Sequence, residues 1–158
     1  NVIYRSNNLG YDTCSQFKKK FKELKSHNTQ TSKIYKDFKN SKVIVCNYPD
    51  TPLTEALVAN IPTIVIFSKK LYQISDRASK ILKDLQENKI LFEDSLSASK
   101  HINNIWKNPE EWWNSYSTQK SLSQLSEHAF NLKKDWIFEW TDFINSEKKL
   151  LGLKRKDN

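Results

Sequence analysis

The chain has 158 residues, a net charge of +8 from 26 basic and 18 acidic residues, and no methionine. Without methionine and starting at Asn1, it is expected to be a piece of a longer protein, long enough for one domain with its own core. Because 23 of the 26 bases are lysines, we favour a solvated basic surface over a nucleic-acid interface, and the abundant aromatic residues exclude a disordered chain.

The first two thirds of the chain alternate between strand and helix patterns. The predicted strands lie at 2–4, 42–46, 62–67 and 90–92, and the predicted helices at 16–24, 34–38, 53–60, 72–88 and 97–106. Strands that are apolar along nearly their whole length are typical of a parallel sheet with helices on both faces. Thr51 is the expected N-cap of the helix over 53–60, with Pro52 beginning it.

The last third of the chain reads as helical. Pro109 is expected to begin a new helix, and a long helix is expected from about residue 118 to 145 with a break near Leu132. The fold class is therefore α/β, a Rossmann-like parallel sheet with a C-terminal helical extension. The predicted parts are a nucleotide-sugar-binding domain over 1–108, packed helices over 109–146 and a frayed basic tail over 147–158.

Cysteine and apolar content restrict the class of protein further. Cys14 and Cys46 are too few for a disulfide framework, and Cys46 lies in an apolar run that predicts a core position. Neither cysteine nor histidine occurs at the spacing of a structural zinc site. No apolar stretch approaches the roughly 20 residues that span a bilayer. We therefore expect a cytoplasmic protein.

The loops that follow the strands hold the candidate site residues. Ligands of doubly wound sheets bind outside the carboxyl ends of the strands, and the loop over 47–54 leads directly into a helix N-terminus, which suits phosphate. Thr51 and Thr54 add hydroxyls there, and Glu55 could accept the hydroxyls of a ribose. The alternative is equally open: Thr51 only caps the helix, and Glu55 only complements its dipole.

Arginine and histidine give weaker signals. Arg5, at the end of the first strand, could reach a donor phosphate with a bidentate guanidinium, or could form only a surface salt bridge. His101 and His128 have no partner at catalytic spacing, so neither receives a role, and His101 is expected to be solvated. The tryptophans are expected to seal the helical extension against the sheet.

The segment over 46–64 resembles the donor-binding signature of GT-B glycosyltransferases. It carries a strand, a threonine-containing loop, a helix that includes Glu55-Ala56-Leu57, and Asn60-Ile61-Pro62 before the next strand. A closer resemblance is to transferases encoded with bacterial surface-polysaccharide (O-antigen type) genes, which share this core, an Ile-x-x-Ile-Trp segment (here 102–106) and a Trp-Trp pair (here 112–113). The resemblance covers residues 2–144.

This resemblance implies the donor-binding half of a glycosyltransferase. It implies that a nucleotide sugar is bound as substrate, with Glu55 on the ribose and Gln73 as a weaker candidate for the sugar. The other residues expected to bind the donor nucleotide and phosphate are Arg5, Tyr48, Thr51 and Thr54. It implies no bound metal or other cofactor, a glycan or lipid-linked acceptor, an acceptor site and catalytic base on a preceding domain, and room for peripheral contact with the inner face of the membrane. The chain departs from the family pattern at Pro52 and Thr54 and in the loop after Phe67.

Two alternatives remain open. One is a sugar-nucleotide epimerase of GT-B architecture, which shares the glutamate-bearing loop. The other is a non-catalytic basic binding module, whose affinity would fall steeply with salt and would ignore nucleotides.

Overall fold

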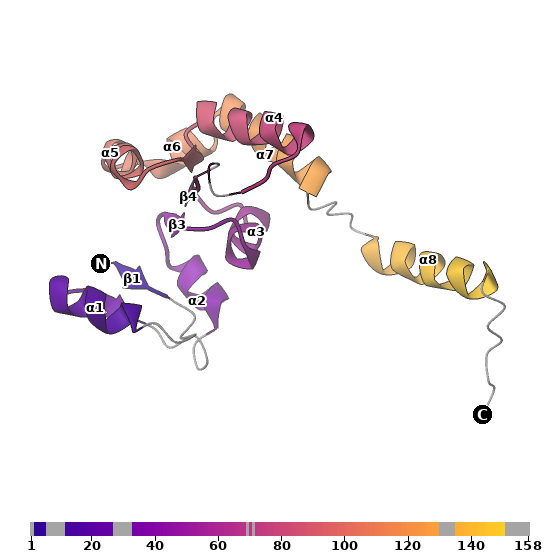
Figure 1. Ribbon diagram of the computed structural model, residues 1–158, viewed down its shortest axis with the longest axis horizontal. Helices are drawn as coiled ribbons and strands as arrows, with labels where there is room; N and C mark the ends of the chain where they lie inside the picture. Colours follow the sequence, from indigo (N-terminus) through magenta and orange to yellow (C-terminus); the bar gives the residue numbers. More distant parts are fainter. Residues whose placement is uncertain are drawn as a thin grey trace.

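A computed structural model describes residues 2–5, 12–26, 33–68, 70, 72–129 and 135–150 (Figure 1). The strands are β1 (Ile3–Tyr4), β2 (Lys25–Ser26), β3 (Ile44–Cys46), β4 (Thr63–Ile66) and β5 (Leu91–Phe92). The helices are α1 (Thr13–Lys20), α2 (Ile34–Lys39), α3 (Thr51–Val58), α4 (Asp76–Glu87), α5 (Ser95–Ile105), α6 (Pro109–Trp113), α7 (Tyr116–Ala129) and α8 (Trp136–Leu150). The predicted break near Leu132 and most of the predicted tail lie outside the described residues.

Strands β3, β4 and β5 form a parallel sheet in that order, as their apolar sequences predict. The register pairs Ile44 with Thr63 and Val65 with Leu91, so each strand lies beside the next one in the chain. Helices α3 and α4 make the crossovers, which gives two consecutive βαβ units. The α/β fold class with a parallel sheet is thereby confirmed.

A second parallel pair, β1 with β2, was only half predicted. Ile3 pairs with Lys25, and the backbone N–H of Lys25 donates to the carbonyl of Val2 at 3.2 Å. The helix expected over 16–24 ends at Lys20 instead, and the polar residues after it pair through their backbone. Because such pairing needs no apolar side chain, the hydrophobic pattern gives no sign of this strand.

The core lies between the three-stranded sheet and the helices on its two faces. On one face, Ile44, Cys46, Val65 and Leu91 pack with Ala56 of α3, Leu85 of α4 and Trp113 of α6. On the other face, Ile64 and Phe92 pack with Ala98 of α5. The small side chain of Ala56 lets α3 approach the sheet closely, and the predicted core position of Cys46 is confirmed.

The two adjacent tryptophans of α6 fasten the helical extension to the sheet, as predicted. Trp113 is 1 % exposed, and its Nε1 donates to both the backbone carbonyl of Asn60 (3.1 Å) and its side-chain Oδ1 (2.9 Å). Trp112 donates from Nε1 to the carbonyl of Asn88 at 3.0 Å. Helix α7 then packs against α4 (Figure 1).

The last helix of the extension differs from the others in its position. The helix expected over 118–145, with a break near Leu132, corresponds to α7 and α8, and α8 lies apart from the sheet and its covering helices (Figure 1). Trp140 of α8 is therefore exposed and does not seal the sheet. None of the helices in the described part of the chain is long and apolar enough to cross a membrane.

Candidate functional site

A pocket of about 650 Å³ opens at the carboxyl edge of the three-stranded sheet. Its floor comes from the residues that follow β3 and β4, and its walls come from α4 and α7. The lining residues are Tyr48, Pro49, Phe67, Tyr72, Gln73, Ile74, Ser75, Arg77, Ala78, Ile81, Leu82, Leu125 and His128. This is the edge at which doubly wound sheets bind their ligands, so we call it the carboxyl-edge pocket.

Three aromatic rings form one side of the carboxyl-edge pocket. The ring of Tyr72 lies 4.8 Å from that of Phe67 and 5.8 Å from that of Tyr48, measured between centroids. Partial burial, reinforced by the neighbouring Tyr48 hydroxyl, raises the pKa of Tyr72. The phenol therefore stays protonated at neutral pH, and the ring cluster presents flat, uncharged surface to a ligand.

Polar side chains of the carboxyl-edge pocket come from its two helical walls. Gln73 precedes α4, and Arg77 lies in its first turn, after the N-cap Ser75. His128 comes from α7, where its Nδ1 lies 2.7 Å from the carbonyl of Gln124, so that nitrogen carries the proton and donates it. The pocket thus combines one cation, one amide and one imidazole with an aromatic surface.

Arg77 and His128 were missed in the sequence. The chain has only three arginines, and Arg77 follows the loop after β4, so its type and place were a usable signal. No comparable signal exists for His128, because α7 reaches the pocket only through its packing on α4.

The start of α3 is closed by Asp50, which is its N-cap instead of the predicted Thr51. Asp50 Oδ1 accepts from the backbone N–H of Thr51 at 2.7 Å, while the Asp50 carbonyl accepts from the N–H groups of Leu53 (2.9 Å) and Thr54 (3.3 Å). Pro52 has no N–H. The donors of this first turn are thus occupied, and a carboxylate stands where the sequence suggested a phosphate.

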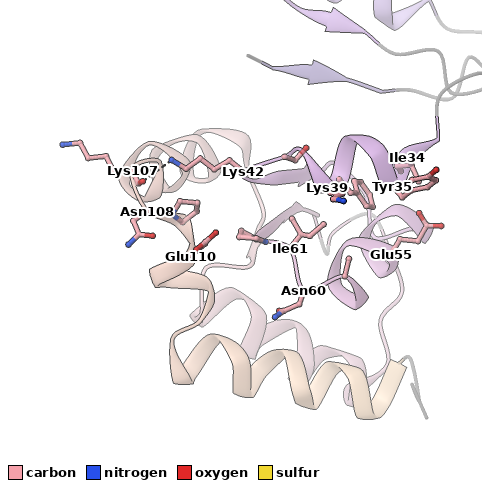
Figure 2. Close-up of a pocket in the computed structure, with 15 residues that line it drawn as sticks. Ile34, Tyr35, Lys39, Lys42, Glu55, Asn60, Ile61, Lys107, Asn108 and Glu110 are labelled. Carbon is pink, nitrogen blue, oxygen red and sulfur yellow. Dashed lines mark hydrogen bonds between the residues drawn. The ribbon is translucent and has the colours of Figure 1, made fainter. Parts of the chain in front are cut away.

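Glu55 lies one turn further along α3 and borders a different pocket. This cavity of about 900 Å³ lies at the amino edge of the sheet, between α2, the end of α3 and the turn before α6 (Figure 2). Glu55 and Tyr35 stand at one end of it, and Lys107 and Glu110 at the other (Figure 2). We call it the amino-edge pocket.

One lysine of the amino-edge pocket is held in place. The Lys42 ammonium donates to the Lys107 carbonyl at 3.1 Å and lies 5.6 Å from the centre of the Trp106 ring. Asn60, which lines the same pocket, accepts hydrogen bonds from Trp113 Nε1 with both its backbone carbonyl and its side-chain Oδ1. The remaining charged groups at its rim are of both signs, so this pocket has no strong preference for anions.

Arg5 forms an ion pair with Asp37 of α2. The two side chains are 16 % and 12 % exposed, so the pair is mostly buried and joins β1 to α2. A buried pair of this kind resists separation, because breaking it leaves a charge without its partner in a poorly solvated place. The predicted site residues are thus divided: Tyr48 and Gln73 line the carboxyl-edge pocket, Glu55 lines the amino-edge pocket, and Arg5, Thr51 and Thr54 line neither.

Other reactive groups do not gather into a second chemical centre in the described part of the chain. Burial raises the pKa of the Cys46 thiol to about 11, so it is no nucleophile at neutral pH. His101 is half-buried between Phe92 and Trp112 rather than solvated, and burial, with a smaller effect of Lys89, lowers its pKa. Within the described ranges, no three His, Cys, Asp or Glu side chains lie together as metal ligands would.

A family model described as LIC12162 family transferase matches residues 2–144 of the chain. No curated protein and no solved structure matches the chain significantly.

Proposed function

Since the chain belongs to the LIC12162 family of transferases, we propose that it binds the nucleotide-sugar donor of a glycosyltransferase whose acceptor is a bacterial surface polysaccharide. The family supplies the transferase activity. The glycosyl donor rests on the resemblance of residues 46–64 to the GT-B signature and on the presence of an open pocket at the carboxyl edge of a parallel sheet.

The carboxyl-edge pocket is the observation that carries the proposal. Its volume suits part of a nucleotide sugar, and the Tyr48 and Tyr72 rings offer surface for a base or a sugar face. Gln73 can hydrogen-bond sugar hydroxyls. Arg77 is a cation at the same pocket and is a better candidate for the donor phosphates than Arg5, which would have to leave Asp37.

The N-terminal half of α3 completes the proposed donor site. Thr51 and Thr54, which line neither pocket, offer hydroxyls in the turn of α3 that follows Pro49, and Glu55, at the rim of the amino-edge pocket, has an exposed carboxylate. In this proposal the donor extends from the carboxyl-edge pocket past the start of α3 so that its ribose reaches Glu55, and its phosphates displace the bond that the Asp50 carboxylate makes to the helix start. The bound donor therefore requires Asp50 to turn away or to be offset by Arg77.

The chemical contribution of this chain is to hold the leaving nucleotide. When the glycosidic bond to the donor breaks, negative charge develops on the phosphate, and a nearby guanidinium stabilises it most in the transition state. GT-B chemistry as a class needs no bound metal. We place the acceptor site and the catalytic base on a second domain of the full protein, as the resemblance implies.

The test is thermal unfolding with a panel of nucleotides and nucleotide sugars carrying UDP, GDP, CMP or dTDP. A ligand at 100 times its dissociation constant stabilises the folded state by about 2.7 kcal/mol, which for a chain of this size is a shift of roughly 5–10 °C. Arg77→Ala, Tyr48→Ala and Glu55→Ala should each remove most of that shift. Lys83→Ala, a highly exposed cation on the same helix as Arg77, is the matched control and should retain it.

The panel also separates the alternatives. If a nucleotide raises the Tm of Arg77→Ala as much as that of Lys83→Ala, the proposed site is wrong. If none of the nucleotides or nucleotide sugars raises the Tm of the unmodified protein, donor binding is contradicted. Binding that ignores nucleotides and weakens steeply with salt would support the basic binding module instead. The family assignment favours group transfer over epimerisation.

A further inference from the structure

Helix α8 presents a stripe of large apolar side chains to solvent. All side chains from Ile137 to Glu147 are exposed, and the helix lies apart from the sheet and its covering helices (Figure 1). At about 100° of rotation per residue, four apolar side chains fall within roughly a third of the helix circumference and form the stripe: Ile137, Trp140, Phe143 and Ile144. Contiguous apolar surface of this kind marks an interaction site more often than a free surface.

The described charges of α8 are all acidic: Glu139, Asp142 and Glu147. Helical rotation places Glu147 within the stripe, one turn after Phe143, and places Asp142 on the opposite face of the helix. A partner that covers the stripe therefore has to offer apolar surface together with a positive charge, because a carboxylate that is removed from water without such a partner is costly.

Helix α1, at the other end of the molecule, offers that combination (Figure 1). It buries no side chain of its own, and Phe17 and Phe21, one turn apart, are 42 % and 52 % exposed, with their rings stacked at 6.5 Å between centroids. The charged residues within the helix are three lysines, Lys18, Lys19 and Lys20. The Lys20 ammonium lies 5.8 Å from the centre of the Phe21 ring, so it belongs to the aromatic face. This face is aromatic and basic, whereas the stripe is aromatic and acidic.

The two faces lie at opposite ends of one chain, so in this arrangement α8 meets an α1 only on a second copy (Figure 1). We propose that two copies of the chain form a two-fold dimer in which the stripe of each α8 packs on the Phe17–Phe21 face of the other copy, with Glu147 beside the partner's Lys20. The two-fold axis makes this contact twice.

The available apolar area is sufficient for such a dimer. Each contact brings together six large apolar side chains that are about half exposed in the single chain. They would bury on the order of 600 Å² at each contact and about 1,200 Å² in the dimer, which is the lower limit of a stable interface. This inference does not rest on the proposed donor site.

The test is sedimentation velocity of the chain at about 0.15 M salt, where a Debye length of about 8 Å screens the repulsion between two chains of +8. An interface of this size should give a dimer with a micromolar dissociation constant. Lys20→Glu and Glu147→Lys should each weaken the dimer about tenfold or more, because each brings like charges together at both contacts. Lys19→Glu and Asp142→Lys are the matched controls: they make the same charge changes on the opposite faces of the same helices and should stay within about twofold of the unmodified chain.

An equal mixture of Lys20→Glu and Glu147→Lys is the sharpest measurement. In a mixed pair both contacts again place a carboxylate beside an ammonium, so the mixture should dimerise about as tightly as the unmodified chain, although neither variant does so alone. All the substituted residues are exposed, so circular dichroism should show that every variant folds.

Three results would contradict the proposal. If the unmodified chain remains a monomer at about 100 μM, the dimer is wrong. If Asp142→Lys weakens the dimer as much as Glu147→Lys does, the stripe is not the interface. If the mixture fails to dimerise, Glu147 does not contact Lys20 of the second copy.

Discussion

Asn60 holds the junction of α3, β4 and α6, and its substitution should separate two sources of stability. Its φ is +52°, in the left-handed region that costs most residues about 1–2 kcal/mol and that asparagine tolerates better. Its Oδ1 accepts from Trp113 Nε1 at 2.9 Å and from Gln119 Nε2 at 3.5 Å, while its backbone carbonyl shares the Trp113 donor at 3.1 Å. The side chain and the backbone angle therefore contribute separately.

Asn60→Ala loses the side-chain hydrogen bond and keeps the left-handed backbone. The bond is worth about 1 kcal/mol net, because the Asn60 carbonyl still accepts from Trp113 and no buried donor is left unpaired. The backbone angle adds about 1 kcal/mol, so the expected loss is about 2 kcal/mol. Asn60→Gly loses the same hydrogen bond. Glycine adopts the left-handed angle without the remaining cost that asparagine bears, but it has more conformational entropy in the unfolded state, and these two effects roughly cancel. The expected loss of stability is therefore about 1 kcal/mol.

The assay is urea unfolding followed by fluorescence and circular dichroism, with thermal unfolding as a second measure. For a chain of this size, about 2 kcal/mol corresponds to a fall of roughly 4–8 °C in Tm, and about 1 kcal/mol to half of that. If Asn60→Gly destabilises the protein as much as Asn60→Ala or more, the backbone angle is not a cost at this position and the argument is wrong.

Four further outcomes follow from the structure. Lys89 also has positive φ (61°) but an exposed side chain, so Lys89→Ala and Lys89→Gly should both stay within about 0.5 kcal/mol of the parent in the same urea assay; a larger loss would mean an unnoticed role. Asp50→Asn keeps an acceptor for the helix cap but removes the negative charge that repels the donor phosphates. Removing about 1 kcal/mol of repulsion should make the stabilising nucleotide bind about fivefold more tightly, as measured by calorimetry. Weaker binding would mean that Asp50 contacts the ligand. Because the pKa of His101 is lowered in the folded state, its contribution to the free energy of unfolding should be fully present above the unfolded pKa of about 6.5 and should be lost as the pH drops below that value. His101→Gln should reduce the difference in stability between pH 7 and pH 5, measured by urea titration. An unchanged difference would mean that other groups cause it. An aromatic disulfide reagent should modify Cys14 in the folded protein and Cys46 only after unfolding, so fast modification of both would contradict the buried thiol.

The central architecture was accessible from sequence because it depends on local apolar runs. The β-branched segments over 42–46 and 62–67 became β3 and β4, shortened by one or two residues at their ends. Helices α4 and α5 lie where helical periodicity placed them. What the pattern could not show was β2, which is held by backbone bonds, and the separation of α8, whose apolar face satisfies the same periodicity as a buried helix.

The candidate site was partly accessible for the same reason. Tyr48 lies in the loop after a strand of the parallel sheet, and Gln73 was named from the family resemblance; both line the carboxyl-edge pocket. Arg5 and Glu55 share that origin, yet the ion pair with Asp37 and the turn of α3 direct them elsewhere. For Arg5 the outcome depends on a partner 32 residues away, about which sequence spacing carries no information, whereas Glu55 follows from its position on α3.

The position of β4 in the sheet sets the order in which the protein should open. It is the strand with a hydrogen-bonded neighbour on each edge: its first residue pairs with Ile44, and the amides of Val65 and Phe67 donate to Ile90 and Phe92 at 2.8 Å. Each partner strand is bonded to β4 alone among the described residues and can fray without breaking the other pair. Local opening should therefore begin at the outer strands, and the slowest amide exchange with solvent should be found at Val65 and Phe67.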